Sequence, residues 1–341
     1  MDNSLRTVRN IKHKYIVIWR MKMVFKTIAD LNKSILENLY RIPNSVDIVI
    51  GVPRSGMLVA SMISVYINKP LLDISSFCEG KVGFGGNMKK HDNWKENYED
   101  ISMVLIVEDS VNSGKSLLEI KQRLSEIPYN KKIIYLAAYV TEESYPLVDM
   151  YFEVCNHPRV FEWNYMHNYL LSEACVDIDG VLCIDPSNEQ NDDGNEYREF
   201  LLNAPSKLLP SQKIGYLVTS RLEKYRSETE IWLRNHNIQY NHLIMMNLNS
   251  AEERRKLNNH GEYKAAIFKK AKRAKWFIES NSFQARTISE LSGKLVFCVD
   301  NQIVYSENGY NKLVQISKSR IKKMLKQYLP NRIQIFIRKM L

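Results

Sequence analysis

Short apolar runs alternate with amphipathic stretches along the first half of the chain. Residues 47–51 form an apolar run that ends in a turn, and residues 57–67 follow with apolar positions at helical spacing. Residues 102–107 repeat this pattern and lead through a polar loop into the amphipathic stretch 116–127, after which residues 132–140 are apolar again. Such alternation predicts a mostly parallel sheet flanked by helices. Ligands of these sheets bind beyond the carboxyl ends of the strands, where both polar loops are expected.

The same alternation begins again in the second half. Apolar runs at residues 173–178, 214–218, 276–278 and 295–299 predict four strands, and stretches such as 227–235 predict helices between them. The expected fold class is therefore α/β with two domains, each a mostly parallel sheet flanked by helices.

The length of 341 residues also favours two domains over one. We place the first domain at residues 1–170 and the second at 171–311, with a basic segment at 312–341. No internal repeat or long low-complexity stretch interrupts this division.

Positive charge is concentrated at the two ends of the chain. Lys and Arg number 48 against 38 Asp and Glu, and residues 312–341 carry nine basic residues and no acidic one. Residues 1–26 carry seven against one, so the middle is net acidic and a nucleic-acid groove is not expected. Residues 317–329 place apolar positions on one helical stripe with Lys and Arg around it. Such a segment either lies on an anionic membrane or packs on the body with a solvated basic face.

The cysteines indicate a reducing environment. There are five, widely spaced and mostly in apolar runs, which favours buried thiols: Cys78, Cys155, Cys175, Cys183 and Cys298. No CxxC or Cys/His cluster suggests structural zinc. No uncharged apolar run approaches the ~18 residues of a membrane span, and no signal segment is evident. A cytoplasmic location is expected, with peripheral contact at the inner face of a membrane through the C-terminal segment as the further expectation.

The loop after the apolar run 104–107 combines two binding chemistries. Glu108 and Asp109 can accept hydrogen bonds from neighbouring sugar hydroxyls, while Ser113, Gly114 and Ser116 offer hydroxyls and backbone N–H groups at a helix N-terminus, which suit a phosphate. An acid pair after a strand, taken alone, is more often simply the start of a helix. This loop nevertheless resembles the 5-phosphoribosyl-1-pyrophosphate (PRPP) loop of type I phosphoribosyltransferases.

A second loop, residues 51–57, is similar to the pyrophosphate loop of the same family. The resemblance implies displacement at the anomeric carbon of PRPP, with pyrophosphate leaving together with Mg²⁺ and the protein acting mainly by positioning and charge stabilisation. In place of the frequent glycine and threonine the first loop has Lys115 and Ser116. The implied PRPP-binding residues are Arg54, Ser55, Gly56, Glu108, Asp109, Asn112, Ser113, Gly114, Lys115 and Ser116, with Glu108 and Asp109 also in the catalytic set.

Two further segments fit the same resemblance. Residues 78–98, rich in Gly and Lys, are similar to the lid that closes over PRPP, although a loop of this composition is usually only solvated. Residues 158–163 stand where the hood segment meets the acceptor. For Phe161 and Trp163, packing in the core and stacking on the acceptor are both open.

The second half carries two carboxylates, Asp177 and Asp179, followed by Gly180 at a strand end. This pattern resembles the first motif of the haloacid dehalogenase superfamily, which implies that Asp177 attacks phosphorus and Asp179 is the general acid and then base. The later motifs have counterparts in Thr219, which would bind a phosphate oxygen, and in Lys264, which would steady nucleophile and phosphate. Lys269, Lys270, Lys272 and Lys275 are nearby competitors for the latter role.

Glu279 stands where the fourth motif usually has aspartate. The resemblance implies a Mg²⁺ site made by Asp177, the backbone carbonyl of Asp179, and Glu279. The short polar insert at residues 183–213 implies a small cap and an open site. The catalytic residues expected here are Asp177, Asp179, Thr219 and Lys264.

Together the two halves, over residues 40–300, are similar to bacterial enzymes that install ribofuranose in capsule or O-antigen polysaccharides. This implies transfer of 5-phosphoribosyl from PRPP to a glycan acceptor, expected to be lipid-linked, and then removal of the 5-phosphate to leave β-ribofuranose. Two alternatives stay open: a nucleotide-salvage transferase with a nucleotidase domain, and a regulator that binds PRPP without catalysis. Nucleic acid is not an expected partner.

Overall fold

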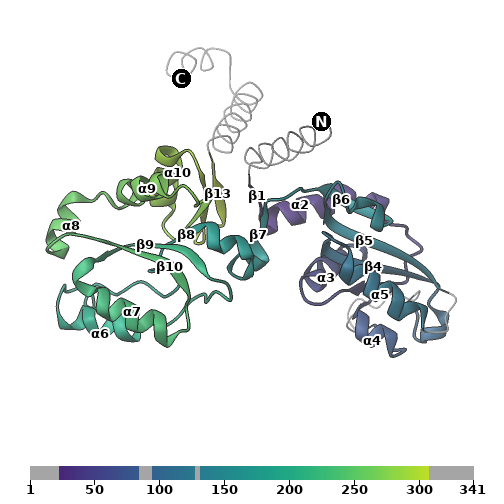
Figure 1. The fold of residues 1–341 in the computed structure, drawn as a ribbon. Helices are drawn as coiled ribbons and strands as arrows, with labels where there is room; N and C mark the ends of the chain where they lie inside the picture. Colours follow the sequence, from purple (N-terminus) through teal and green to yellow (C-terminus); the bar gives the residue numbers. More distant parts are fainter. Residues whose placement is uncertain (1–22, 84–93, 127–130, 307–341) are drawn as a thin grey trace, which may run out of the picture. The chain divides into compact units, whose positions relative to one another are not determined.

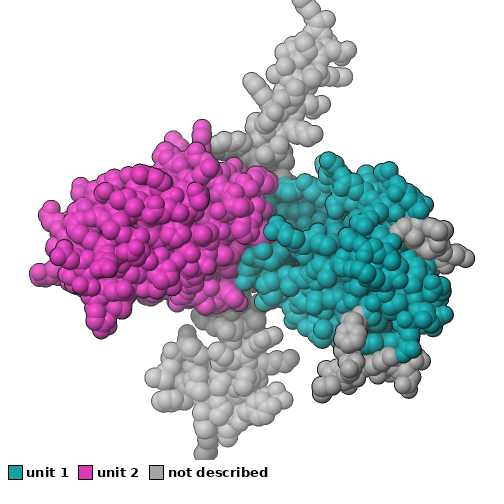
Figure 2. Space-filling view, turned by 90° about the horizontal axis from the view of Figure 1, so that it is seen from below, with its two compact units in different colours: residues 1–163 teal, residues 164–341 magenta. Residues whose placement is uncertain are grey.

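The computed structural model describes residues 23–83, 94–126 and 131–306. The chain divides into two compact units, Met1–Trp163 and Asn164–Leu341, which Figure 2 shows in different colours. Each unit has its own sheet and helices (Figure 1). Residues 84–93 of the predicted lid and the whole basic segment 312–341 lie outside the described residues.

The first unit is built on a five-stranded parallel sheet in the order β3-β2-β4-β5-β6. Its strands are β2 (Ile48–Gly51), β3 (Leu71–Asp73), β4 (Met103–Ser110), β5 (Lys132–Val140) and β6 (Met150–Val154). A separate parallel pair joins β1 (Val24–Lys26) to β7 (Arg159–Phe161).

Helices cover both faces of this sheet because successive side chains of a strand point to opposite faces. On one face Val49 and Leu105 pack in a cluster with α2 (Ile28–Asn38) and α3 (Ser55–Ile67). On the other, Ile106 packs with α4 (Ile74–Cys78) and α5 (Lys115–Ser125). The predicted α/β fold with a parallel sheet flanked by helices is confirmed for this unit.

The second unit has a six-stranded sheet in the order β10-β9-β8-β11-β12-β13. All neighbours are parallel except β13, which runs antiparallel at one edge. The strands are β8 (Ala174–Val176), β9 (Ile214–Leu222), β10 (Tyr240–Met246), β11 (Trp276–Glu279), β12 (Leu295–Cys298) and β13 (Ile303–Tyr305). Strand β10 forms the other edge.

Five α-helices accompany this sheet in the described part of the chain. They are α6 (Asn195–Asn203), α7 (Arg226–Asn235), α8 (Ala251–Leu257), α9 (His260–Lys270) and α10 (Ser282–Ser292). Helices α9 and α10 pack on one face of the sheet in a cluster that includes Phe268, Phe277 and Ile288. Across both units, short 3-10 helices lie at Leu39–Arg41, Tyr98–Asp100, Tyr145–Leu147, Glu162–His167, Tyr169–Glu173 and Glu223–Tyr225.

Two strands extend further than their apolar patterns indicate. Strand β4 runs to Ser110, so Glu108 and Asp109 lie inside the strand, and β9 continues to Leu222, beyond Thr219. Polar side chains are acceptable there because they project from the carboxyl end of the sheet, where ligands of α/β folds bind. All five cysteines are free, and all except the half-buried Cys78 are buried.

Candidate active sites

The loops that follow β2 and β4 lie at the same edge of the first sheet. The two strands are parallel neighbours, and Gly51 is in register with Val107. The Val52 N–H donates to Val107 O at 3.0 Å, which ties the start of one loop to the end of the other strand. The structure thus brings together the two loops in which sequence reasoning placed PRPP.

Gly56 is the point at which helix α3 approaches strand β4. A methyl group added there would lie 2.7 Å from Val107 O and 3.2 Å from Glu108 Cα, both backbone atoms. No larger residue fits without displacing the strand. The neighbouring Arg54 is exposed, and the peptide bond between Pro53 and Arg54 is cis. The glycine therefore sets how closely the first loop lies to the acidic end of β4.

Glu108 and Asp109 are consecutive in β4 and so point to opposite sides of the strand. Glu108 Oε1 accepts a hydrogen bond from the Ser116 hydroxyl at 3.0 Å. Asp109 Oδ2 accepts from the Trp163 indole N–H at 2.8 Å. One carboxylate therefore faces the start of α5, while the other is anchored to the segment in which the hood was expected.

The loop before α5 exposes its polar groups. Gly114 adopts the left-handed conformation with φ of +74°, and a side chain there would collide with Leu147. This turn lets the chain enter α5 with the first backbone N–H groups of the helix unpaired within it, an arrangement that suits a phosphate. The exposed polar residues of the loop are Asn112, Ser113, Lys115 and Ser116.

An aromatic stack stands beside the acidic pair. The Tyr139 and Phe161 ring centroids are 5.1 Å apart, and those of Phe161 and Trp163 are 4.8 Å apart with the planes inclined by 7°. Phe161 is buried and packs in the core, whereas Trp163 is half-buried at the outer end of the stack. Beneath them the buried Arg159 donates to Cys155 O at 2.6 Å and to Val111 O at 3.2 Å. Sequence reasoning gave Arg159 no role.

Burial governs the electrostatics of the acidic pair. It raises the pKa of Glu108 to about 7, and the nearby Asp109 charge adds to the rise. Burial also raises the pKa of Asp109, although the Trp163 hydrogen bond and the Arg159 guanidinium act in the opposite direction. Without a ligand, Glu108 is therefore only partly ionised near neutral pH.

Replacing Glu108 by glutamine is expected to change how stability depends on pH. The pKa of Glu108 is raised in the folded state, so folding favours the protonated side chain. Its contribution to the free energy of unfolding is therefore complete below pH 4.5 and is lost as pH rises through about 7. The native protein should lose roughly 2–3 kcal/mol across this window, and Glu108→Gln should lack that loss. Urea unfolding at several pH values measures it, with the exposed Glu119→Gln as control. If the free energy of unfolding of Glu108→Gln falls with pH as steeply as that of the native protein, the pKa of Glu108 is not raised by burial.

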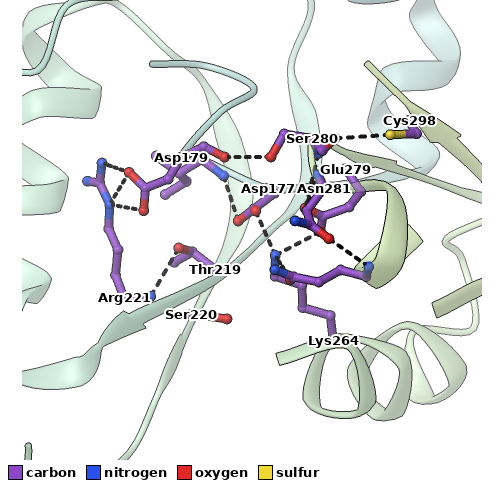
Figure 3. A network of polar contacts seen from close by, with 12 residues as sticks. Asp177, Asp179, Thr219, Ser220, Arg221, Lys264, Glu279, Ser280, Asn281 and Cys298 are labelled. Carbon is purple, nitrogen blue, oxygen red and sulfur yellow. Dashed lines mark hydrogen bonds and ion pairs between the residues drawn. The ribbon is translucent and has the colours of Figure 1, made fainter. Parts of the chain in front are cut away.

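In the second unit, three charged side chains meet at the ends of neighbouring strands (Figure 3). Asp177 follows β8, Glu279 ends β11, and Lys264 comes from α9. Lys264 Nζ lies 2.6 Å from Asp177 Oδ2 and 2.7 Å from Glu279 Oε2, and all three side chains are buried. Gln284 Oε1 also accepts from Nζ, at 2.9 Å. The structure thus selects Lys264 over the lysines that compete with it in sequence as the partner of these carboxylates.

Backbone groups complete the hydrogen bonding of the two carboxylates. The Ile178 N–H donates to Asp177 Oδ1 at 2.9 Å. Glu279 Oε1 accepts from the Ser280 and Asn281 N–H groups at 3.0 and 3.2 Å. The side chains are therefore held in fixed positions, and this orientation is what a reacting group needs.

Asp179 is held separately, by an arginine that sequence reasoning did not assign. Arg221 Nη2 lies 2.6 Å from Asp179 Oδ1, and Arg221 Nε contacts both carboxylate oxygens at 3.1–3.2 Å. Burial disfavours the charged form of Asp179, but the Arg221 guanidinium outweighs this and lowers its pKa. Thr219 lies two residues before Arg221 in β9, and its hydroxyl accepts from the Arg221 N–H at 3.2 Å.

A cavity of about 400 Å³ opens over these groups. Asp177, Asp179, Thr219, Lys264 and Glu279 all line it, together with residues from α8 and from the segment after Asp179. Arg254 of α8 donates to Ser220 O at 3.1 Å and to Asn191 Oδ1 at 3.3 Å. Arg254, Arg255 and His260 line the cavity but were not anticipated from sequence.

The titration of the buried cluster follows from the same contacts. Burial raises the pKa of Asp177, and the negative charge of Glu279 acts in the same direction. The Lys264 ammonium opposes this rise but does not cancel it. For Lys264, burial favours the neutral form, but the Asp177 and Glu279 carboxylates outweigh it and raise its pKa. Lys264 is therefore a permanent cation at this site.

In residues 23–83, 94–126 and 131–306, no group of three or more His, Cys, Asp and Glu side chains is placed to hold a metal ion. None of the helices in those ranges is long and apolar enough to cross a bilayer.

Comparisons with known proteins find a similarity in the N-terminal half of the chain. Residues 20–169 match the model of the phosphoribosyl transferase domain. A purine phosphoribosyltransferase from Pyrococcus horikoshii is 21% identical, with a TM-score of 0.32, over 42% of this chain and 94% of its own. A Helicobacter pylori xanthine-guanine-hypoxanthine phosphoribosyltransferase is 17% identical, with a TM-score of 0.32, over 41% and 92%. The search of curated proteins found no match.

Proposed function

We propose that the phosphoribosyl transferase domain of residues 20–169 transfers 5-phosphoribosyl from PRPP to a glycan acceptor, and that the second unit then removes the 5-phosphate. The net product is ribofuranose, β-linked because displacement inverts the α-configuration of PRPP. The observation that carries the proposal is the buried cluster of Asp177, Lys264 and Glu279, which lines a cavity in the same chain as a PRPP-using domain. The first reaction makes the kind of phosphate monoester that such a cavity suits.

In the transfer step the chain acts by positioning. Glu108 and Asp109 would receive the ribose hydroxyls, and the loop from Asn112 to Ser116 would hold the 5-phosphate at the start of α5. Arg54 is exposed on the other loop and would bind the departing pyrophosphate. None of these groups needs to form a covalent bond, since charge stabilisation lowers the barrier of an oxocarbenium-like displacement.

For the second step we propose the haloacid dehalogenase chemistry indicated by sequence. An Asp177 oxygen attacks phosphorus, the bond from phosphorus to the sugar oxygen breaks, and Asp179 as general acid gives its proton to that oxygen. Water then hydrolyses the aspartyl phosphate and returns a proton to Asp179. Arg221 lowers the pKa of Asp179, which favours the ionised form that takes a proton from the attacking water in the second half of the reaction. Thr219 and the α8 residue Arg254 line the same cavity and would bind phosphate oxygens.

The donor set at this site fits Mg²⁺. This ion takes oxygen ligands and is usually held by one or two carboxylates plus water and phosphate, so a three-residue cluster is not required. Asp177, Glu279 and the backbone oxygen of Asp179, which accepts from the Ser280 hydroxyl at 3.3 Å, offer such ligands. When bound, Mg²⁺ would neutralise charge on the phosphate.

The acceptor is proposed to be a lipid-linked glycan at the cytoplasmic face of a membrane. The insert after Asp179 contains a single α-helix, α6, in keeping with a small cap. A small cap leaves the cavity accessible to the end of a long chain. The basic segment 312–341 supplies positive charge for an anionic surface.

Mass spectrometry of acceptor oligosaccharides tests the proposal. Incubation with PRPP and Mg²⁺ should add pentose, with phosphopentose as an earlier product. Pyrophosphate release that depends on nucleobases, with no change in any glycan, would instead support nucleotide salvage. A regulator that only binds PRPP would give neither product.

A further inference from the structure

A second hollow in the C-terminal unit lies apart from the proposed phosphatase cavity. It has a volume of about 460 Å³ and shares no lining residue with that cavity. It lies beside the edge strand β10 and the C-terminal end of α9, whereas Lys264 is nearer the other end of that helix. The proposed phosphoryl chemistry does not use this hollow.

The walls of the hollow are mainly apolar. Ile244 of β10 and Ile267 of α9 line it, and both are half-buried at the margin of the core cluster under α9. Tyr216 and His242 form an aromatic wall, with ring centroids 4.8 Å apart and planes inclined by 20°. Because β10 is an edge strand, apolar residues of the core reach the surface here. An apolar ligand in the hollow would pack against these residues and extend the core.

Three cations stand at the rim of the same hollow. Lys270, Lys272 and Arg273 line it and are exposed, and none of them makes an ion pair or a side-chain hydrogen bond with any residue of the described ranges. No acidic residue occurs between Glu262 and Glu279, so the surrounding sequence does not neutralise them. An anion at this rim would face unpaired positive charge.

We propose that this hollow binds one anionic phospholipid, with a hydrocarbon chain between Tyr216 and Ile267 and the phosphate at Lys270, Lys272 and Arg273. The apolar walls suit a hydrocarbon chain, and the cations at the rim suit a phosphate group. A phospholipid has both parts, so it fits both features of the hollow. A polyanion such as nucleic acid would use the rim but not the apolar interior. An edge strand from another protein would use the backbone of β10 but not the rim.

Photo-crosslinking of the full chain locates the ligand. The probe is lysophosphatidylglycerol with a diazirine in its acyl chain, kept below its micelle concentration, because a phosphodiester is not a substrate for phosphomonoester hydrolysis. Mass spectrometry should place the crosslinks in peptides of β10 and α9. The zwitterionic lysophosphatidylcholine with the same chain should label these peptides much less, because its choline opposes the cationic rim.

Two variants distinguish the site from general charge. Replacing Lys270, Lys272 and Arg273 by serine should weaken labelling by about two orders of magnitude, or roughly fivefold per cation. The matched control, Lys213→Ser with Arg234→Ser, removes two exposed cations elsewhere on the same unit and should leave labelling unchanged. Ile244→Thr keeps β-branching but adds a hydroxyl to the wall and should weaken labelling several-fold.

Three results would overturn the assignment. Equal labelling by both lipids would show that the phosphate does not contact the rim. Labelling confined to the basic ends of the chain would place the lipid elsewhere. Suppression of labelling by an equal concentration of inorganic phosphate would show that the hollow binds anions without a contribution from its apolar walls. All three readouts are independent of transferase and phosphatase activity, so their failure leaves the proposed function untouched.

Discussion

Asparagine in place of Asp177 is expected to stop phosphate removal while leaving the transfer of phosphoribosyl intact. The variant has no carboxylate to form the aspartyl phosphate, and loss of a nucleophile typically costs three or more orders of magnitude in rate. Acceptor oligosaccharides incubated with PRPP and Mg²⁺ should therefore accumulate as phosphopentose adducts. Mass spectrometry of the acceptor measures the ratio of phosphorylated to plain pentose.

The control for this variant is Asp185→Asn. Asp185 lines the same cavity and makes no contact with Lys264 among the ion pairs of the described chain, so its loss should change the rate far less. Appearance of plain pentose at the native rate with Asp177→Asn would exclude Asp177 as the nucleophile. Loss of both products would instead show that the second unit is needed for transfer.

Methionine in place of Lys264 is expected to destabilise the second unit by about 3–5 kcal/mol at neutral pH. Lys264 is 2% exposed and contacts Asp177 and Glu279 at 2.6 and 2.7 Å, so its removal leaves two buried carboxylates without their cation. Urea unfolding followed by circular dichroism measures the loss. Added Mg²⁺ should restore part of the stability, because an ion that binds only the folded state favours it.

Two further variants separate lost charge from lost packing. Lys269→Met, on the exposed side of the same helix, should change stability by no more than about 0.5 kcal/mol. Adding Asp177→Asn and Glu279→Gln to Lys264→Met should recover much of the loss, since no unpaired charge then remains. If Lys264→Met alone is as stable as the native protein, the three side chains do not form a buried charged cluster.

Apolar periodicity was sufficient to predict the central strands of both sheets and the order of the loops. It worked for β2 and β4 because strands covered on both faces have to be apolar throughout. It failed for β3 and β7, which have three residues each, and for β10, which begins with partly exposed polar residues at the edge of its sheet. Short or half-exposed strands carry too few apolar positions to show a period.

The candidate sites divide in the same way. Asp177 and Glu279 were expected together only through the resemblance to haloacid dehalogenase motifs. In the structure they lie close because β8 and β11 are parallel neighbours. Pairing of Asp179 with Arg221 and of Asp109 with Trp163 could not be predicted, since it depends on side-chain orientations that no motif specifies. The position of Arg254 depends on how α8 packs, and the sequence pattern does not define that packing.

The bond between Asp109 and the Trp163 indole gives the first unit an intrinsic optical reporter. The indole ring is half-buried, stacks on Phe161, and directs its N–H at the Asp109 carboxylate. Its emission wavelength responds to the electric field of that carboxylate. Binding of the proposed sugar ligand at the acidic end of β4 should therefore shift the emission of Trp163, with no need to follow product formation.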